Sequence, residues 1–160
     1  VFISTISVYG DTSKANISED APPELHRRPL FTERYVLAGR VGHPGLMQAP
    51  SREQFCALEH VMVSREGGGF FGVTDRALAD VGLMRKVVLS VPHFLMAMSV
   101  LASTDLVAML PSRLVLGNPA LQVVDAPLEV PGYEMAMFWG ERSHRDPAHK
   151  WLREHLLASV

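Results

Sequence analysis

Short runs of apolar residues, separated by polar turns, recur along most of the chain. Residues 1–10 mix β-branched and aromatic positions with small polar ones, which predicts a strand, whereas residues 11–23 are polar and rich in turn formers. From residue 30, strand-like runs alternate with segments of helical spacing. The predicted strands are 30–41, 60–64, 86–91, 105–110, 121–124 and 133–139, and the predicted helices are 51–58, 75–80, 92–102, 112–116 and a last one from 147. This alternation predicts an α/β fold with mostly parallel sheets covered by helices.

Capping residues support three of the predicted helices. Ser51 and Gln54 have the spacing of a capping box, in which each side chain satisfies a free backbone N–H of the other. Thr74 is the candidate N-cap of the next helix. Pro92 suits the first turn of the third helix, since a proline there loses no helical hydrogen bond.

The last helix has the clearest signals. Asp146 is the predicted N-cap and Pro147 the first helical residue. Trp151, Leu152 and Leu156 then form an apolar stripe on one face, together with Ala148 and His155. We expect this stripe to dock the helix on the sheet.

Composition narrows the possible functions. With 160 residues and 48% hydrophobic content, the chain can build the core of one domain or of two small lobes. The 15 Lys and Arg residues nearly balance the 17 Asp and Glu residues, so there is no basic field to hold nucleic acid. The single cysteine, Cys56, excludes an internal disulfide framework and fits a reducing compartment. Neither a membrane-spanning run nor a signal peptide is visible, which predicts a cytoplasmic protein without a membrane partner.

Several short motifs resemble a known family. They are residues 40–44 (RVGHP), 60–63 (HVMV), 78–87 (LADVGLMRKV), 91–95 (VPHFL), 102–111 (ASTDLVAMLP), 137–139 (MFW) and 146–153 (DPAHKWLR). In this order and spacing they resemble the C-terminal effector-binding domain of LysR-type transcriptional regulators, especially the branch that senses aromatic acids. The match runs from about Leu30 to the C-terminus.

The resemblance implies a periplasmic-binding-protein-like fold, with two α/β lobes and a small-molecule effector in the cleft between them. Residues 44–124 would be the full second lobe, residues 30–43 and 125–160 a partial first lobe, and residues 1–29 an atypical N-terminal strand and linker. The family's winged helix-turn-helix and the opening part of the first lobe have no counterpart in the sequence. The chain, which begins at Val1, is therefore expected to be a fragment of a longer product. Homo-oligomers are implied by the family, and DNA contact would come only from the absent N-terminal domain.

Five residues are candidate effector contacts. His93 stands at a predicted helix start, where free N–H groups and the helix dipole favour a carboxylate, and Phe94 would add an apolar wall. The resemblance strengthens this role for His93. The alternative is that His93 only caps the helix or packs against its neighbours. Thr104 is a candidate polar contact or a turn residue. Phe70 and Phe71 either line the pocket or belong to the core.

A dehydrogenase is the rival interpretation. Residues 1–11 resemble the catalytic-serine strand of extended short-chain dehydrogenases, the sugar epimerase and reductase type. Ser4 or Ser7 with Tyr9 and Lys14 would then form a proton relay. Tyr9 and Lys14, however, are five residues apart and separated by turn formers, so a structural strand is the favoured interpretation.

A glycine-rich segment belongs to the same alternative. Gly67, Gly69 and Gly72 satisfy G-x-G-x-x-G between a predicted strand and helix, as a dinucleotide site requires. The acidic residue expected at the end of the next strand, residues 87–91, is missing. A flexible turn bordering the cleft is the favoured interpretation. An NAD(P)-dependent epimerase or reductase fragment stays as the alternative function, and an inactive hybrid that does not fold is a third.

Metal chemistry finds little support. Of the seven histidines, His144, His149 and His155 lie closest together, but they are five and six residues apart and do not share a helical face. The sequence thus predicts a binding module with no catalytic residue, metal ligand or cofactor.

Overall fold

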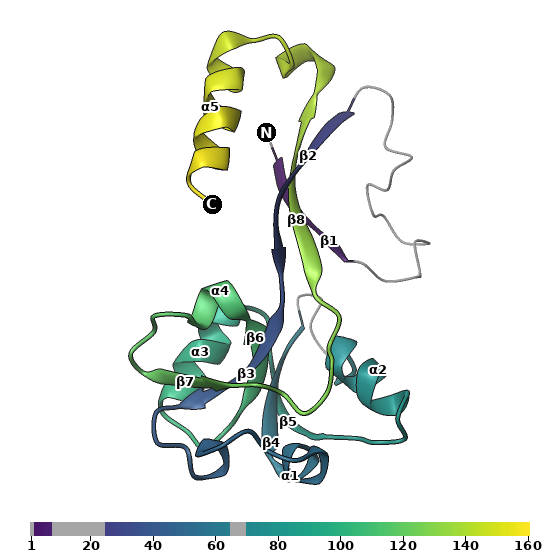
Figure 1. Cartoon of the computed structure of the whole chain (residues 1–160), viewed down its shortest axis with the longest axis vertical. Helices are drawn as coiled ribbons and strands as arrows, with labels where there is room; N and C mark the ends of the chain where they lie inside the picture. The colour runs from purple at the N-terminus through teal and green to yellow at the C-terminus, as the bar shows by residue number, and fades with distance from the viewer. Residues whose placement is uncertain (1, 8–24, 65–69) are drawn as a thin grey trace. The chain divides into compact units, whose positions relative to one another are not determined.

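The structure is a computed structural model that describes residues 2–7, 25–64 and 70–160 of the chain (Figure 1). The chain divides into two compact units. The first unit is formed by Val1–Glu33 with Gly132–Val160, and the second by Arg34–Pro131. The predicted loop at residues 11–23 lies outside the described residues.

The second unit carries most of the predicted alternation. Its elements are β3 (Tyr35–Arg40), η1 (Pro44–Leu46), α1 (Arg52–Ala57), β4 (Glu59–Val63), α2 (Val73–Ala79), β5 (Lys86–Val91), α3 (Phe94–Ala102), β6 (Ala108–Pro111), α4 (Ser112–Val115) and β7 (Leu121–Val124). Mixed helices and strands confirm the α/β class for this part of the chain. All of the predicted second lobe, residues 44–124, lies in this unit. Residues 34–43 and 125–131, assigned from the sequence to the first lobe, also fall in this unit. Residues 35–40 do so as β3, which pairs with β6 and β7.

Strand direction in the second unit is mixed. β4 and β5 are parallel, and Val107, just before β6, joins β4 through a parallel bridge to His60. These strands are linked by the crossover helices α2 and α3, the connection that parallel neighbours need. β3, in contrast, runs antiparallel to both β6 and β7. The predicted parallel arrangement therefore holds for the segment from β4 to the start of β6, in which α2 and α3 connect the strands. The prediction is wrong for β3 and β7, because β3 is antiparallel to both β6 and β7.

Two cores lie on opposite faces of the central strands. Successive residues of a strand point to opposite faces, so Val36 and Ala38 enter one core and Leu37 the other. The first core is completed by Ala97 and Leu101 of α3. The second core takes side chains from α1 and α2, including Phe55 and Leu78. β3 is therefore covered on both faces.

The first unit is a three-stranded antiparallel sheet with a C-terminal helix. Its elements are β1 (Phe2–Ser7), β2 (Leu25–Glu33), β8 (Tyr133–Gly140), η2 (Glu141–Ser143) and α5 (Pro147–Ala158). β8 lies between β1 and β2 and is antiparallel to both, so the prediction of parallel strands is wrong here too.

β2 begins five residues earlier than the sequence predicted. The missed start is polar and contains Pro29, which argues against a central strand. β2 lies at the edge of the sheet among the described residues, and its register shifts between Pro29 and Phe31. A proline is tolerated at such a place because an edge strand needs fewer N–H donors.

Helix α5 starts as predicted but docks by a different face. Asp146 is the N-cap and accepts a hydrogen bond from the His149 backbone N–H at 2.9 Å. Trp151 and Leu152, however, are 63% and 39% exposed, so the predicted apolar docking stripe is wrong. Arg153 is the buried residue of this helix. The helix is thus rotated so that a face containing Arg153, not Trp151, meets the sheet.

Local capping predictions gave mixed results. Ser51 and Gln54 form the predicted capping box. Gly72, not Thr74, is the N-cap of α2, because the Asp75 side chain reaches back to the Gly72 N–H and replaces a side-chain cap. Pro92 precedes α3, whose N-cap is His93.

Candidate functional site

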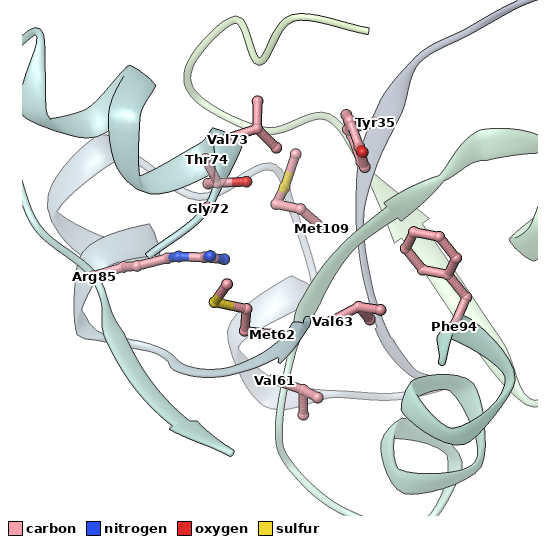
Figure 2. A pocket seen from close by; sticks show the side chains of 10 residues that line it. All are labelled: Tyr35, Val61, Met62, Val63, Gly72, Val73, Thr74, Arg85, Phe94 and Met109. Carbon is pink, nitrogen blue, oxygen red and sulfur yellow. The ribbon is translucent and has the colours of Figure 1, made fainter. Parts of the chain in front are cut away.

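A small cavity in the second unit is the candidate site (Figure 2). Its volume is about 70 Å³. It is lined by Tyr35, Val61, Met62, Val63, Gly72, Val73, Thr74, Arg85, Phe94 and Met109. In Figure 2, Arg85 and Thr74 lie on one side, Tyr35 and Phe94 on the other, and Met62 and Met109 between them. The cavity therefore combines an apolar middle with polar groups at its edges.

The fold brings these side chains together from six elements or their flanks. β4 supplies consecutive residues at its carboxyl end, Val61 to Val63. α2 and α3, which precede and follow β5, begin beside the cavity with Gly72–Thr74 and Phe94. The carboxyl ends of parallel strands and the starts of the following helices meet at the same edge of such a sheet, where ligands of open α/β sheets commonly bind.

Arg85 is the charged group of the cavity, and it is almost completely buried. Its side chain is 4% exposed and donates to both carboxylate oxygens of Asp75 at 2.8 Å. Asp75 also accepts the Gly72 N–H at 2.8 Å. Burial opposes the ionisation of Asp75, but the hydrogen bonds and charge of Arg85 outweigh it and lower the pKa of the carboxyl. The pair is ionised and held in place.

The chemistry that this arrangement supports is binding. Because Arg85 is neutralised by Asp75, the cavity presents oriented N–H and hydroxyl groups, not an uncompensated charge. Within the described residues, no group of three or more His, Cys, Asp or Glu side chains could hold a metal ion. The glycines 67 and 69 of the proposed dinucleotide motif, and Tyr9 and Lys14 of the proposed proton relay, lie outside the described residues.

Two of the predicted contacts lie at the cavity or beside it. Phe94 lines it as the first residue of α3. His93 is exposed at the N-cap, and its side chain makes no capping hydrogen bond within the described part of the chain. The backbone N–H groups of the first turn of α3 are therefore not capped by His93.

Thr104 lies at the other end of α3. Its hydroxyl donates to the Val100 carbonyl at 2.9 Å and accepts the Leu106 N–H at 3.3 Å. The nine residues of α3 separate it from His93, which corresponds to about 13 Å of helix. The structure does not bring Thr104 together with the cavity.

Phe70 and Phe71 line a second cavity of about 320 Å³ in the same unit. They are 58% and 62% exposed, so they are not core residues. Arg85 lines this cavity as well as the first one. The cavity that Phe94 lines and the cavity that the two phenylalanines line therefore share Arg85.

Sequence reasoning missed three polar residues of the site. The sequence predicts Tyr35 only as part of a strand and Thr74 only as a helix cap, and Arg85 lies in one of the motifs that resemble the family. These residues line one cavity because of tertiary contacts between segments far apart in the sequence. The local spacing of residues does not predict such contacts. The Asp75–Arg85 pair, ten residues apart, follows neither helical nor strand periodicity.

The fold and the site together define the class of protein, an α/β binding domain without a recognisable catalytic constellation among the described residues. The comparisons with known proteins agree. The family described as "LysR substrate binding domain" matches residues 15–160. The chain belongs to this family, and the resemblance found in the motifs is confirmed.

A curated relative gives the same assignment. The HTH-type transcriptional regulator SyrM 1 of Sinorhizobium fredii is 38% identical over 144 residues, which cover 88% of this chain and 43% of that protein. The chain therefore spans less than half the length of this relative.

Two solved structures support the fold. A probable transcriptional regulator of Pseudomonas aeruginosa, PA0477, is 30% identical with a TM-score of 0.68, covering 86% of this chain and 45% of that one. The regulatory domain of MexT, a transcriptional activator of the same organism, is 28% identical with a TM-score of 0.68, covering 87% and 68%. Such domains have a periplasmic-binding-protein-like α/β fold, so this predicted class is confirmed, while the mostly parallel sheets predicted with it are found only around β4 and β5. No comparison supports the dehydrogenase alternative.

Proposed function

We propose that the chain is the effector-sensing part of a bacterial LysR-type transcriptional regulator. The observation that carries this proposal is the cavity at the carboxyl end of β4, where Arg85, Thr74 and Tyr35 surround an apolar middle. Ligand sites typically combine apolar walls with a few fixed polar groups. We assign the second unit to one lobe of the binding domain and the first unit to the other.

His93 and Phe94 are the residues that we propose to contact the effector. The uncapped first turn of α3 favours an anionic group, and His93 adds a hydrogen-bond donor beside it. Phe94 offers an aromatic face to an apolar or aromatic body. The effector that fits best is a small aromatic carboxylate. Thr104 is not included in this proposal because its hydroxyl is used at the far end of α3.

The volume of the cavity limits what it can hold alone. About 70 Å³ is smaller than the roughly 300 Å³ of a typical small-molecule pocket. The cavity would therefore take one end of the effector. Phe70 and Phe71, which line the larger cavity that shares Arg85 with this one, are candidates for a second contact.

Calorimetric titration of the chain with a panel of aromatic carboxylic acids tests this proposal. The expected result is saturable binding of at least one acid, with His93→Ala weakening it about tenfold, the loss of one charge-assisted hydrogen bond. His155→Ala is the matched control, since His155 is also exposed but lies on α5 of the first unit. Equal affinities of the two variants would contradict the role of His93.

Partners and location complete the proposal. The relative SyrM 1 is named as a helix-turn-helix regulator, and the chain matches 43% of it. We therefore propose that DNA contact in the whole protein comes from a separate N-terminal domain. We also propose that the protein acts in the cytoplasm as a homo-oligomer. Its role in this proposal is that of a sensor and not of an enzyme. None of the described helices is long and apolar enough to cross a membrane.

A further inference from the structure

A cavity in the first unit has a charged and aromatic lining that effector binding in the second unit does not explain. It has a volume of about 710 Å³ and lies where β8 passes into η2 and α5. Its lining is mainly charged and aromatic: His26, Arg28, Trp139, Glu141, His144, Arg145, Lys150, Arg153 and Glu154. Such a composition is unlike that of an apolar crevice between packed elements.

The aromatic wall of this cavity is fixed by several mutual contacts. The rings of His26 and His144 stack with centroids 3.8 Å apart, and His26 also stacks on Trp139 at 5.5 Å. The indole N–H of Trp139 donates to Nδ1 of His144 at 3.1 Å. Because Nδ1 accepts this hydrogen bond, Nε2 carries the ring proton of His144 and is a donor.

Arg153 holds the same wall from the side of α5. Its guanidinium lies 4.6 Å from the Trp139 ring centroid and donates to the carbonyls of Ser143 and His144 at 3.0 and 2.8 Å. The residue is 6% exposed. Its positive charge is therefore fixed in place by carbonyls and a ring, without a carboxylate partner among the described residues.

The charges of the cavity do not balance. Both acidic side chains are engaged, Glu141 with His26 at 2.5 Å and Glu154 with Lys150 at 3.9 Å. Arg28 on β2 and Arg145 before α5 line the cavity and form no ion pair within 4 Å in the described part of the chain. The pKa of Glu141 is lowered mainly by its hydrogen bond with His26, and the charge of Arg145 contributes less. The lining holds four permanently cationic side chains, Arg28, Arg145, Lys150 and Arg153, against two carboxylates. Two positive charges are left for a ligand.

We propose that this cavity binds the phosphate group of a small phosphorylated molecule. A phosphate monoester carries a charge of about −1.5 to −2 at neutral pH, which matches the two uncompensated charges. Arg28 and Arg145 contact the phosphate oxygens, because the planar guanidinium fork suits phosphate geometry. The volume leaves room for an organic group beside the phosphate, against the wall of stacked rings.

Titration of the whole 160-residue chain with phenyl phosphate at pH 8, followed by calorimetry, tests the proposal. We expect saturable binding with a Kd of about 1 mM or tighter, and inorganic phosphate should compete for the site. Arg28→Gln and Arg145→Gln should each raise the Kd about tenfold, the loss of one charged hydrogen bond. Both residues are exposed, so thermal melts should show that the variants keep the fold.

Arg142→Gln is the matched control. Arg142 is exposed in η2, three residues before Arg145, and does not line the cavity, so the Kd should change less than about twofold. His93→Ala should leave phenyl phosphate binding unchanged, which separates this site from the proposed effector site. The proposal would be overturned by absence of saturation at about 20 mM phenyl phosphate. Equal losses for Arg142→Gln and Arg145→Gln would also overturn it. So would binding of a DNA duplex, but not phenyl phosphate, through Arg28 and Arg145.

Discussion

Arg85 donates two parallel hydrogen bonds to Asp75, from Nε to Oδ1 and from Nη2 to Oδ2, both at 2.8 Å. Their side chains are only 4% and 10% exposed. Through Gly72 the same carboxylate caps α2, and through Arg85 it borders two cavities. One ion pair thus supports a helix start and the wall of the candidate site together.

Asp75→Asn should destabilise the fold strongly. The variant leaves the buried guanidinium of Arg85 without a counter-charge, which typically costs about 3 to 5 kcal/mol. Urea unfolding followed by circular dichroism measures this change. Glu59→Gln is the control, because Glu59 pairs with Lys86 at 2.5 Å but in solvent, where such a pair contributes about 1 kcal/mol or less. Similar losses in both variants would show that burial of the Asp75 pair does not matter.

The stability of the chain should fall as the pH is lowered from about 6.5 to about 4. Burial is the main reason that the pKa of His60 drops from 6.5 to about 4, although its hydrogen bond to the Phe55 carbonyl opposes the change. Between these pH values the unfolded chain binds more protons than the folded one, so acid favours unfolding. The slope should approach about 1.4 kcal/mol per pH unit.

His60→Gln provides the test of this assignment. Glutamine keeps a donor for the Phe55 carbonyl, which His60 contacts at 2.8 Å, but does not titrate. Denaturant unfolding at several pH values should give a flatter profile for the variant in this window. Asp75 interferes little, because its pKa is held below the ordinary value of 3.8 and its contribution begins to be lost only near that pH, at the acid end of the window. An unchanged slope in the variant would mean that other groups cause the pH dependence.

The docking of α5 predicts an unusual pair of results. Arg153→Met should lower stability by about 1.5 to 3 kcal/mol, since it removes hydrogen bonds to two carbonyls and a contact with Trp139. Trp151→Ala, on the exposed face, should change stability by about 0.5 kcal/mol or less. Thermal or urea melts of both variants show which face of α5, the one with Arg153 or the one with Trp151, packs on the sheet. A larger loss from Trp151→Ala would restore the apolar stripe expected from the sequence.

The capping box of α1 makes a smaller contribution that is still measurable. Ser51→Ala removes the acceptor for the Gln54 N–H, at 3.2 Å, and should cost about 1 kcal/mol. Ser51→Asp should recover most of this loss, because aspartate is an equally good N-cap. Chemical denaturation of both variants measures the difference. Failure of aspartate to restore stability would indicate a role for Ser51 outside the cap.

Much of the fold was predictable because its signals are local. Ser51 with Gln54, and Asp146 with Pro147, act within one helical turn, so the sequence alone locates both helix starts. The face on which α5 docks was not predictable in this way. An arginine becomes a core-facing residue only where carbonyls and a ring, here those of Ser143, His144 and Trp139, accept its charge.

The site shows the same limit. Phe94 is a predicted effector contact because flanking residues indicate the start of its helix, and the structure places it in the lining of the cavity. Tyr35 and Arg85 also line this cavity but lie fifty residues apart in the sequence. Only the completed packing of β3 against β6, and of β5 beside β4, brings them to one place.

β3 has a consequence for how this sequence can change. Val36 and Ala38 enter one core and Leu37 enters the other, so neither face of the strand is open to water. Adding or deleting one residue there would exchange the side chains of the two cores at once. Substitution by another apolar residue of similar volume, in contrast, changes the packing of only one of the two cores. The strand should therefore tolerate variation in identity while its length stays fixed.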